Sequence, residues 1–195
     1  MPTPLLDLLL ELCAIPSPPG DERVVADRVA AELRSFGLEP DEDDTGPTVG
    51  SNAGNLLARL PATTAAGTPL FLCAHLDTVP PDGAIEPVVE DGVVRNAAGT
   101  IVGVDNKAAI AVMVEAVRRL RNENVPHAGV ELLFTTKEEV GLRGAGAFDA
   151  SRLRATVGYV YDMAAPIGEV ILGAPTARSL ELRFHGRAAH SGMAP

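Results

Sequence analysis

The segment from residue 71 to residue 79 ends an apolar run with a histidine and an aspartate. Its sequence is Phe-Leu-Cys-Ala-His-Leu-Asp-Thr-Val, which places His75 and Asp77 at the end of the run. Residues two apart on a strand point the same way, so we expect both side chains on one face. Imidazole is a common metal ligand, and a neighbouring carboxylate can fix its tautomer and raise its basicity. The pair is equally compatible with a structural role at a strand end.

Two aspartates lie beside other predicted elements. Asp105 directly precedes an alanine-rich stretch, residues 106–120, whose apolar residues fall on one face of a helix. An aspartate there can cap the helix, or its carboxylate can bridge two metal ions. Asp162 ends the apolar segment Gly158-Tyr-Val-Tyr-Asp162 and could instead close a turn. Each position alone leaves a structural and a metal-binding interpretation open.

Two adjacent acids, Glu138 and Glu139, come shortly after the apolar run of residues 130–135. Thr136 and Lys137 lie between the run and the acids. Paired carboxylates beside a buried strand are costly unless something positive holds them. In a dimetal hydrolase one such acid binds metal, while the other takes a proton from the activated water. The alternative is a solvated loop, because two glycines follow nearby.

The periodicity of the chain predicts the elements that must hold these residues. Val25, Val29 and Leu33 recur at helical spacing, and Asp91-Gly92 between two valine pairs is a strong hairpin signal. Residues 41–54 are acidic or rich in glycine, serine and asparagine, and predict a solvated loop. The predicted helices cover residues 4–14, 21–36 and 106–120, and the predicted strands cover residues 55–60, 69–75, 88–89, 93–94, 130–135 and 157–161.

Strands that alternate with helices predict an α/β fold with a mostly parallel sheet flanked by helices. The runs at 130–135 and 157–161 are largely apolar, which is typical of strands buried on both faces. In an open α/β sheet, ligands bind at the carboxyl ends of the strands. His75, Asp162 and the acids at 138–139 each follow a predicted strand, as does Asp105. We therefore expect these side chains to converge in one cleft.

The end of the chain changes character. Residues 179–184 alternate Leu180, Leu182 and Phe184 with polar residues, which predicts a strand with one wet face. One such strand cannot bury its apolar face alone. We expect residues 1–174 to form a catalytic domain that lacks its C-terminal segment, and residues 175–195 to begin a second, truncated domain.

Composition restricts the partners and the compartment. The chain has 195 residues, 46% of them hydrophobic, and a net charge of −10, which would repel nucleic acid and anionic membranes. Cys13 and Cys73 lie in apolar runs without CxxC spacing, so we expect buried free thiols in a reducing cytoplasm. The N-terminal stretch lacks a basic leader and a cleavage site, and no run reaches membrane-spanning length.

Five segments, in order and spacing, resemble a family of zinc-dependent exopeptidases. They are HLDTV, GVDNKAAIAV, TTKEEVGLRGA, YDMAAPIGEV and GRAAHSGMAP. The family contains peptidase T, aminoacylases and desuccinylases, and the chain is most similar to the peptidase T-like branch. The resemblance covers nearly the whole chain and implies an α/β catalytic domain followed by an α+β lid domain that usually dimerises.

The resemblance implies a role for each site residue. His75 and Asp162 would bind one metal ion, Glu139 would bind the other, and Asp105 would bridge the two. Asp77 would orient His75. Glu138 would be the general base, and His190 in the lid domain would bind the substrate.

The implied reaction is the hydrolysis of short peptides by a tripeptide aminopeptidase-like enzyme. Its cofactors would be two divalent ions, zinc by family expectation, although the ligand types also suit cobalt or manganese. Two departures stand out: Asn106 replaces a second acid of many relatives, and a last histidine ligand from a C-terminal segment is absent. An acyl-amino-acid hydrolase, or a truncated fragment that binds metal without turnover, are the alternatives.

Overall fold

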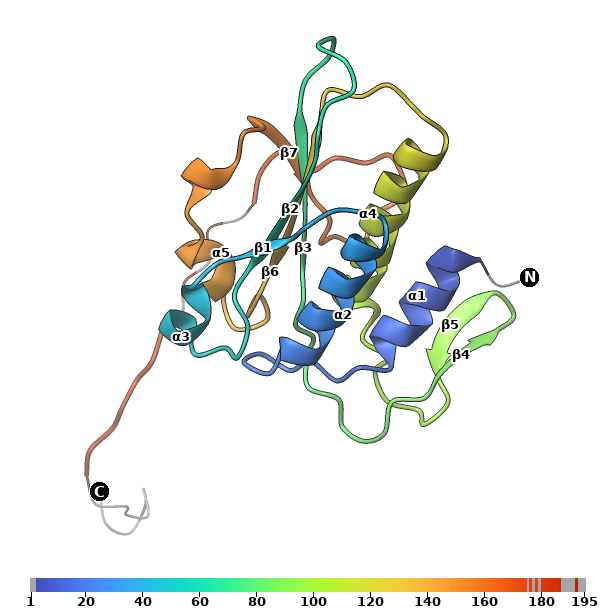
Figure 1. The fold of residues 1–195 in the computed structure, drawn as a ribbon. Coiled ribbons are helices and arrows are strands. Elements are labelled where there is room, and N and C mark those ends of the chain that lie inside the picture. The colour runs from blue at the N-terminus through green and yellow to red at the C-terminus, as the bar shows by residue number, and fades with distance from the viewer. Residues whose placement is uncertain (1–2, 175, 177, 179, 187–191, 193–195) are drawn as a thin grey trace. The chain divides into compact units, whose positions relative to one another are not determined.

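A five-stranded mixed sheet forms the centre of the computed structural model, which describes residues 3–174, 176, 178, 180–186 and 192 (Figure 1). Its strands are β1 (Asp41–Glu42), β2 (Leu56–Leu60), β3 (Leu70–His75), β6 (Val130–Thr135) and β7 (Val157–Val160), in the order β1-β2-β6-β3-β7. β3 pairs in parallel with both β6 and β7, whereas β2 runs antiparallel to β1 and β6. The predicted α/β class is confirmed, with one strand reversed in an otherwise parallel sheet.

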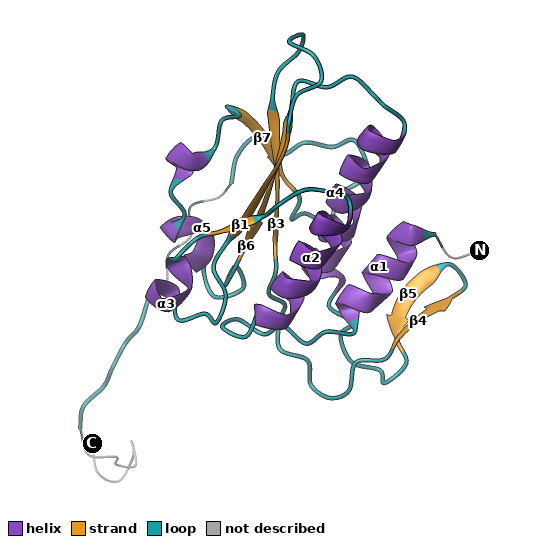
Figure 2. Ribbon diagram, in the orientation of Figure 1, coloured by secondary structure: helices purple, strands orange, loops and turns teal. Residues whose placement is uncertain are grey.

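Helices cover both faces of this sheet (Figure 2). The longer helices lie on one face and the short ones on the other, so the sheet has an apolar core on each side. The first group is α1 (Pro4–Cys13), α2 (Arg23–Ser35) and α4 (Val104–Asn122), and the second group is α3 (Thr45–Val49), α5 (Arg143–Ala147) and the 3-10 helix Ala150–Arg152.

The central strand β6 is buried on both faces, and its sequence is apolar except for Glu131 and Thr135. Its side chains alternate between the two faces, as they must in a strand. Leu132 and Phe134 belong to the larger core under α1, α2 and α4, whereas Leu133 packs in the smaller core with Leu57 and Cys73. All six residues of β6 are buried, as the run predicted, and its one charged side chain forms an ion pair with Arg59. Cys13 is also buried, and both thiols are free.

The local signals for turns and helix ends work as predicted. The Thr3 side chain accepts a hydrogen bond from the Leu6 N–H and caps α1. β4 (Pro87–Glu90) and β5 (Val93–Asn96) form an antiparallel hairpin. Asp91 and Gly92 both have positive φ, 51° and 77°, which is the backbone that a tight hairpin turn demands.

Three expectations were wrong. Residues 41–54 are not simply a solvated loop, because they contain β1 and α3; the Asp43 carboxylate accepts bonds from Thr45 and Asn55 and orders the segment. β7 is exposed along its length rather than buried on both faces; among the described residues it pairs with β3 alone and forms an edge of the sheet. An apolar run indicates a strand, but its depth depends on the sheet order.

The third wrong expectation is the strand predicted over residues 179–184. Residues 180–184 form no strand in the part of the chain that the structure describes. Alternation shows which side chains would share a face, but a strand also needs a neighbour for its backbone hydrogen bonds. The chain divides into two units, residues 1–163 and residues 164–195. No helix among the described residues is long and apolar enough to cross a membrane.

Candidate metal centre

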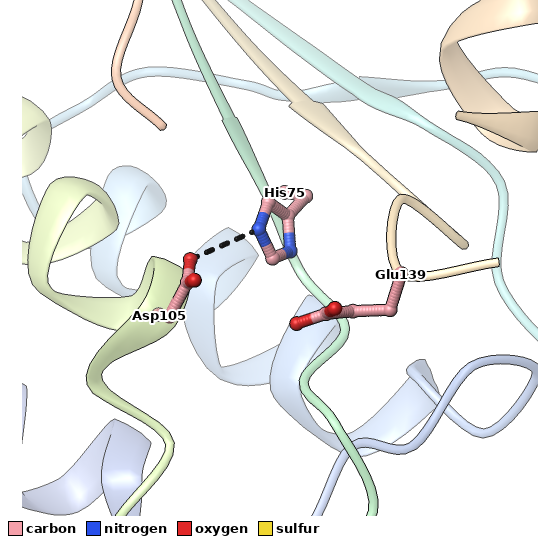
Figure 3. Close-up of side chains that lie close together, drawn as sticks. All are labelled: His75, Asp105 and Glu139. Atoms are coloured by element: carbon pink, nitrogen blue, oxygen red, sulfur yellow. Dashed lines mark ion pairs between the residues drawn. The ribbon is translucent and has the colours of Figure 1, made fainter. Parts of the chain in front are cut away.

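The carboxyl ends of the three parallel strands bring the predicted site residues to one edge of the sheet. His75 is the last residue of β3, Glu138 and Glu139 follow β6, and Asp162 follows β7. Parallel strands end at the same edge, so these side chains meet although the chain separates them widely. Asp105 reaches the same place from the first turn of α4 (Figure 3).

The imidazole of His75 lies at the centre of this cluster. Its Nε2 atom is 3.2 Å from Asp105 Oδ1, 3.7 Å from Asp162 Oδ1 and 3.9 Å from Glu138 Oε2. Nε2 is buried and has no hydrogen-bond partner of good geometry. Buried polar atoms are nearly always satisfied, so an unpartnered ring nitrogen among carboxylates is the position that a cation would complete.

Asp77 determines which ring nitrogen is free. The Nδ1 atom of His75 is 2.8 Å from the backbone carbonyl oxygen of Asp77 and 3.5 Å from its carboxylate. With Nδ1–H donating there, Nε2 is the ring nitrogen that faces the cluster, and its lone pair becomes available to a cation when its proton is displaced. The nearer acceptor for Nδ1 is the main chain of Asp77 and not its side chain, and the expected orienting role of the carboxylate stays a prediction.

The negative charge of the cluster perturbs its members. Burial alone would lower the pKa of His75, but the hydrogen bond and charge of Asp77 and the charge of Asp162 raise it to about 9. Burial raises the pKa of Glu138, nearby carboxylates raise it further, and the charge of His75 opposes them. Burial likewise raises the pKa of Asp162. The carboxylates thus favour a positive charge at His75, and a bound divalent cation would supply it in place of the proton.

Two overlapping sets of side chains have the spacing of metal ligands. One is His75, Asp105 and Glu139 (Figure 3), and the other is His75, Glu138 and Asp162; within each set the ligand atoms lie within 4.8 Å of one another. Imidazole and carboxylate donors are the types that divalent transition metals accept. The donor set and the unpartnered Nε2 together fit a divalent metal ion. Glu138, which the resemblance implies is a base, is itself a member of the second set.

Asn106 has a contact that its residue type did not reveal. Its side-chain amide is buried and donates to the backbone carbonyl oxygen of Tyr161 at 2.5 Å. This bond joins the start of α4, where Asp105 lies, to the end of β7, where Asp162 lies. An ionised acid at this position could not donate that bond.

Sequence reasoning missed two further buried residues, Glu22 and Asn55. Their side chains accept hydrogen bonds from the backbone N–H groups of Lys137 and Thr136, just before Glu138. Glu22 resembled an ordinary acid at a helix start, and Asn55 the first residue of a strand. No local pattern could reveal these contacts, because the partners are 115 and 81 residues apart.

A family model now decides the relationship. The model described as peptidase family M28 matches residues 55–191, which include every proposed metal ligand. The chain belongs to peptidase family M28.

This M28 chain is also similar to individual proteins. It is 37% identical to the uncharacterized protein YqjE of Bacillus subtilis over 191 residues, which is 98% of this chain and 51% of that protein. The crystal structure of aminopeptidase PepT from Bacillus cereus matches with a TM-score of 0.79 and 36% identity, over 83% of this chain and 43% of that one. A tripeptidase from Staphylococcus aureus matches with a TM-score of 0.78 and 32% identity, over the same shares.

These matches confirm the resemblance to peptidase T-like enzymes for the part of the M28 fold that the chain contains. The chain spans about half the length of the proteins it matches. His190, the expected substrate-binding residue, lies outside the described residues, and its role stays a prediction. The structure therefore describes the strand-end cluster without His190.

Proposed function

We propose that the protein is a metal-dependent exopeptidase that removes the N-terminal residue of short peptides, and of tripeptides in particular. The observation that carries the proposal is the buried Nε2 of His75, unpartnered and facing three carboxylates within 3.9 Å. Similarity to PepT and to a tripeptidase supports this class of substrate over other amides.

In this proposal two divalent ions, zinc in the first place and cobalt or manganese otherwise, bind at the cluster. His75 and Asp162 would hold one ion, Glu139 would hold the other, and Asp105 would be a ligand of both. The bound ions would acidify a water molecule and polarise the scissile carbonyl group. A last histidine ligand, from a segment outside this sequence, would complete the coordination of the second ion.

Glu138 is the proposed general base. Its raised pKa suits a group that first takes a proton from water and then returns it to the leaving amine. Asp77 would hold His75 and, through two backbone N–H groups, the loop of Glu138. His190 would bind the substrate from a lid domain that begins near residue 175, after a catalytic domain over residues 1–174, and through which the complete protein dimerises.

A hollow beside the cluster offers room for the substrate. It encloses about 520 Å³ and is lined by Val79, Pro80, Asp82 and the segment 99–101. The Val79 N–H donates to Glu139 Oε1 at 3.2 Å, so one wall of the hollow contacts a proposed metal ligand directly. We propose that the first residue of the peptide lies here. The buried free thiols at 13 and 73 support a reducing, cytoplasmic setting.

The test is a substrate panel on the complete protein loaded with zinc, cobalt or manganese. The panel contains a tripeptide, a dipeptide, an N-blocked tripeptide and an N-acetyl-amino acid. We expect cleavage of the free tripeptide, and a loss of roughly a hundredfold or more in kcat for Glu138→Gln at unchanged metal content. Preference for the N-acetyl-amino acid would replace the proposal with an acylase, and metal binding without turnover would indicate a noncatalytic protein. Full activity in Glu138→Gln would reject Glu138 as the base.

A further inference from the structure

Side chains, and not a helix or sheet, hold the segment that carries Glu138. Four consecutive backbone N–H groups, from Thr136 to Glu139, each donate to a side-chain oxygen. The acceptors are Asn55 Oδ1 at 3.1 Å, Glu22 Oε1 at 3.2 Å, Asp77 Oδ1 at 2.8 Å and Asp77 Oδ2 at 3.1 Å. Backbone N–H groups need partners when they leave a strand, and here the partners also fix where the next side chains point.

Glu22 is the most unusual of these acceptors. It is 0% exposed, and among the described residues no lysine or arginine forms an ion pair with it. A carboxyl group in such a place requires hydrogen bonds instead. Besides Lys137, Glu22 Oε1 accepts from the Gly20 N–H at 2.9 Å, and Oε2 accepts from Ser51 Oγ at 2.6 Å.

A purely local role does not account for this burial. Glu22 is the residue before α2, but its side chain makes no capping bond to that helix. It turns instead toward two loops that are distant in sequence, at Ser51 and at Lys137. The carboxylate therefore joins three segments of the chain at a point directly beside the proposed base.

The backbone at Lys137 needs such a restraint. Its φ is 53°, in the left-handed region that residues with a Cβ atom rarely adopt. This conformation turns the chain out of β6 so that Glu138 and Glu139 face the cluster. The bond from its N–H to Glu22 holds the turn, and its ammonium donates to the Gly50 carbonyl oxygen at 3.2 Å in the same loop as Ser51.

We propose that Glu22 is a positioning residue for the proposed base Glu138. It acts through the Lys137 N–H, keeping the left-handed turn in place, and it touches neither substrate nor metal. The inference rests on the proposed function for the role of Glu138 as a base, but the restraint on residues 136–139 is a property of the fold alone.

The test compares three variants of the complete protein by hydrogen exchange, metal content and kinetics. Glu22→Ala removes all three bonds of the carboxylate. Glu22→Gln keeps an oxygen for the Lys137 and Gly20 N–H groups, and its amide can donate to Ser51 Oγ. This variant should therefore keep the amide exchange and the kcat of the wild type. Ser51→Ala is the matched control, because it removes the hydroxyl's bonds to Glu22 and to the Ala53 N–H and leaves the bond between Glu22 and Lys137.

We expect faster amide exchange confined to residues 136–139 in Glu22→Ala, in both metal-free and metal-loaded protein. Metal content should stay near that of the wild type, and kcat should fall roughly ten- to hundredfold with KM changed little, because a small displacement of a catalytic group is enough. Glu22→Gln and Ser51→Ala should exchange like the wild type in this segment and keep most of kcat.

Wild-type exchange at residues 136–139 in Glu22→Ala would overturn the inference, as would equal losses of kcat in Glu22→Gln and Glu22→Ala. If Glu22→Ala does not fold, Glu22→Asp decides by the same criteria, since a shorter carboxylate should keep the bond to Gly20 and lose the distant one to Lys137. If the wild type cleaves no substrate of the panel, the proposed function fails, while the exchange data still decide whether Glu22 holds the segment.

Discussion

The carboxylate of Asp77 accepts a hydrogen bond from the backbone N–H of Glu138 at 2.8 Å. Its second oxygen accepts from the N–H of Glu139 at 3.1 Å, and its main-chain carbonyl oxygen lies 2.8 Å from His75 Nδ1. One fully buried residue thus connects the histidine at the end of β3 to the acidic pair after β6. This connection explains how two loops far apart in sequence keep a common geometry.

Asp77→Asn should weaken this connection. An asparagine offers one oxygen and one NH₂ group, so one of the two backbone N–H groups would lose its acceptor while buried. We expect a loss of roughly 1–3 kcal/mol in the free energy of unfolding at neutral pH. Urea denaturation of metal-free protein measures it.

The same variant predicts a pH dependence. Burial raises the pKa of Asp77, but bonds from His75 and from two backbone N–H groups outweigh burial and lower the pKa below its usual value. The stabilisation is therefore fully present above the ordinary aspartate pKa of about 4 and is lost as the pH falls through the lower, folded value. The wild type and Asp77→Asn should converge in stability below that pH. A constant difference across the acid range would contradict the role of the charge.

Asp162→Asn should lower the metal content of the protein. The change removes a charged donor 3.7 Å from His75 Nε2 and keeps the shape of the side chain. Elemental analysis after dialysis against limiting zinc measures the ratio of metal to protein. Asp149→Asn is the control, because Asp149 is an exposed acid that caps the 3-10 helix at 150–152. Equal metal content in both variants would remove Asp162 from the ligand set.

Asn106→Ala should weaken metal binding without removing a ligand. It deletes the bond to the Tyr161 carbonyl oxygen, which joins the segments of Asp105 and Asp162. Loss of such a supporting contact typically costs roughly tenfold or more in metal affinity, which competition with a chromophoric chelator measures. Asn122→Ala, at the exposed far end of the same helix, should bind metal like the wild type.

Ile110→Ala should destabilise the fold strongly. Ile110 is 0% exposed on the inner face of α4, so truncation leaves a cavity in the larger core and costs about 2–5 kcal/mol. Val112, two residues along the helix, is 47% exposed, and Val112→Ala should change stability by less than about 0.5 kcal/mol. Urea denaturation compares the two. Similar losses would mean that α4 does not present the described face to the sheet.

The thiols of Cys13 and Cys73 should be unreactive in the folded protein. Burial raises the pKa of Cys13 to about 11, against the small opposing effect of Lys107, and burial with the charge of Asp162 raises that of Cys73 to about 12. A thiol whose pKa lies this far above the solvent pH stays protonated and reacts slowly. A disulfide reagent near pH 8 should react with both thiols only after the protein is unfolded in urea. Rapid reaction of the native protein would contradict the buried positions.

The sequence by itself predicted the four longer strands of the central sheet and its hairpin, the three long helices and the places where acids follow strands. Local periodicity is enough for this, because the run at 130–135 can be buried on both faces only as a central strand, and β6 is one. The rule that ligands bind at the carboxyl ends of parallel strands then predicted that His75 lies near Asp105, Glu138 and Asp162, and the structure places them within 3.9 Å of its Nε2 atom.

Only the tertiary structure decided how that cluster is held. The exposure of β7 depends on the order of the strands, and the local sequence does not contain that order. The bonds from Glu22 to Lys137 and from Asn106 to Tyr161 join residues 115 and 55 positions apart. Such contacts arise when the chain packs, since a buried polar group takes whichever partner the fold brings near it. The residue types for the chemistry are thus local, whereas their positioning is a property of the whole fold.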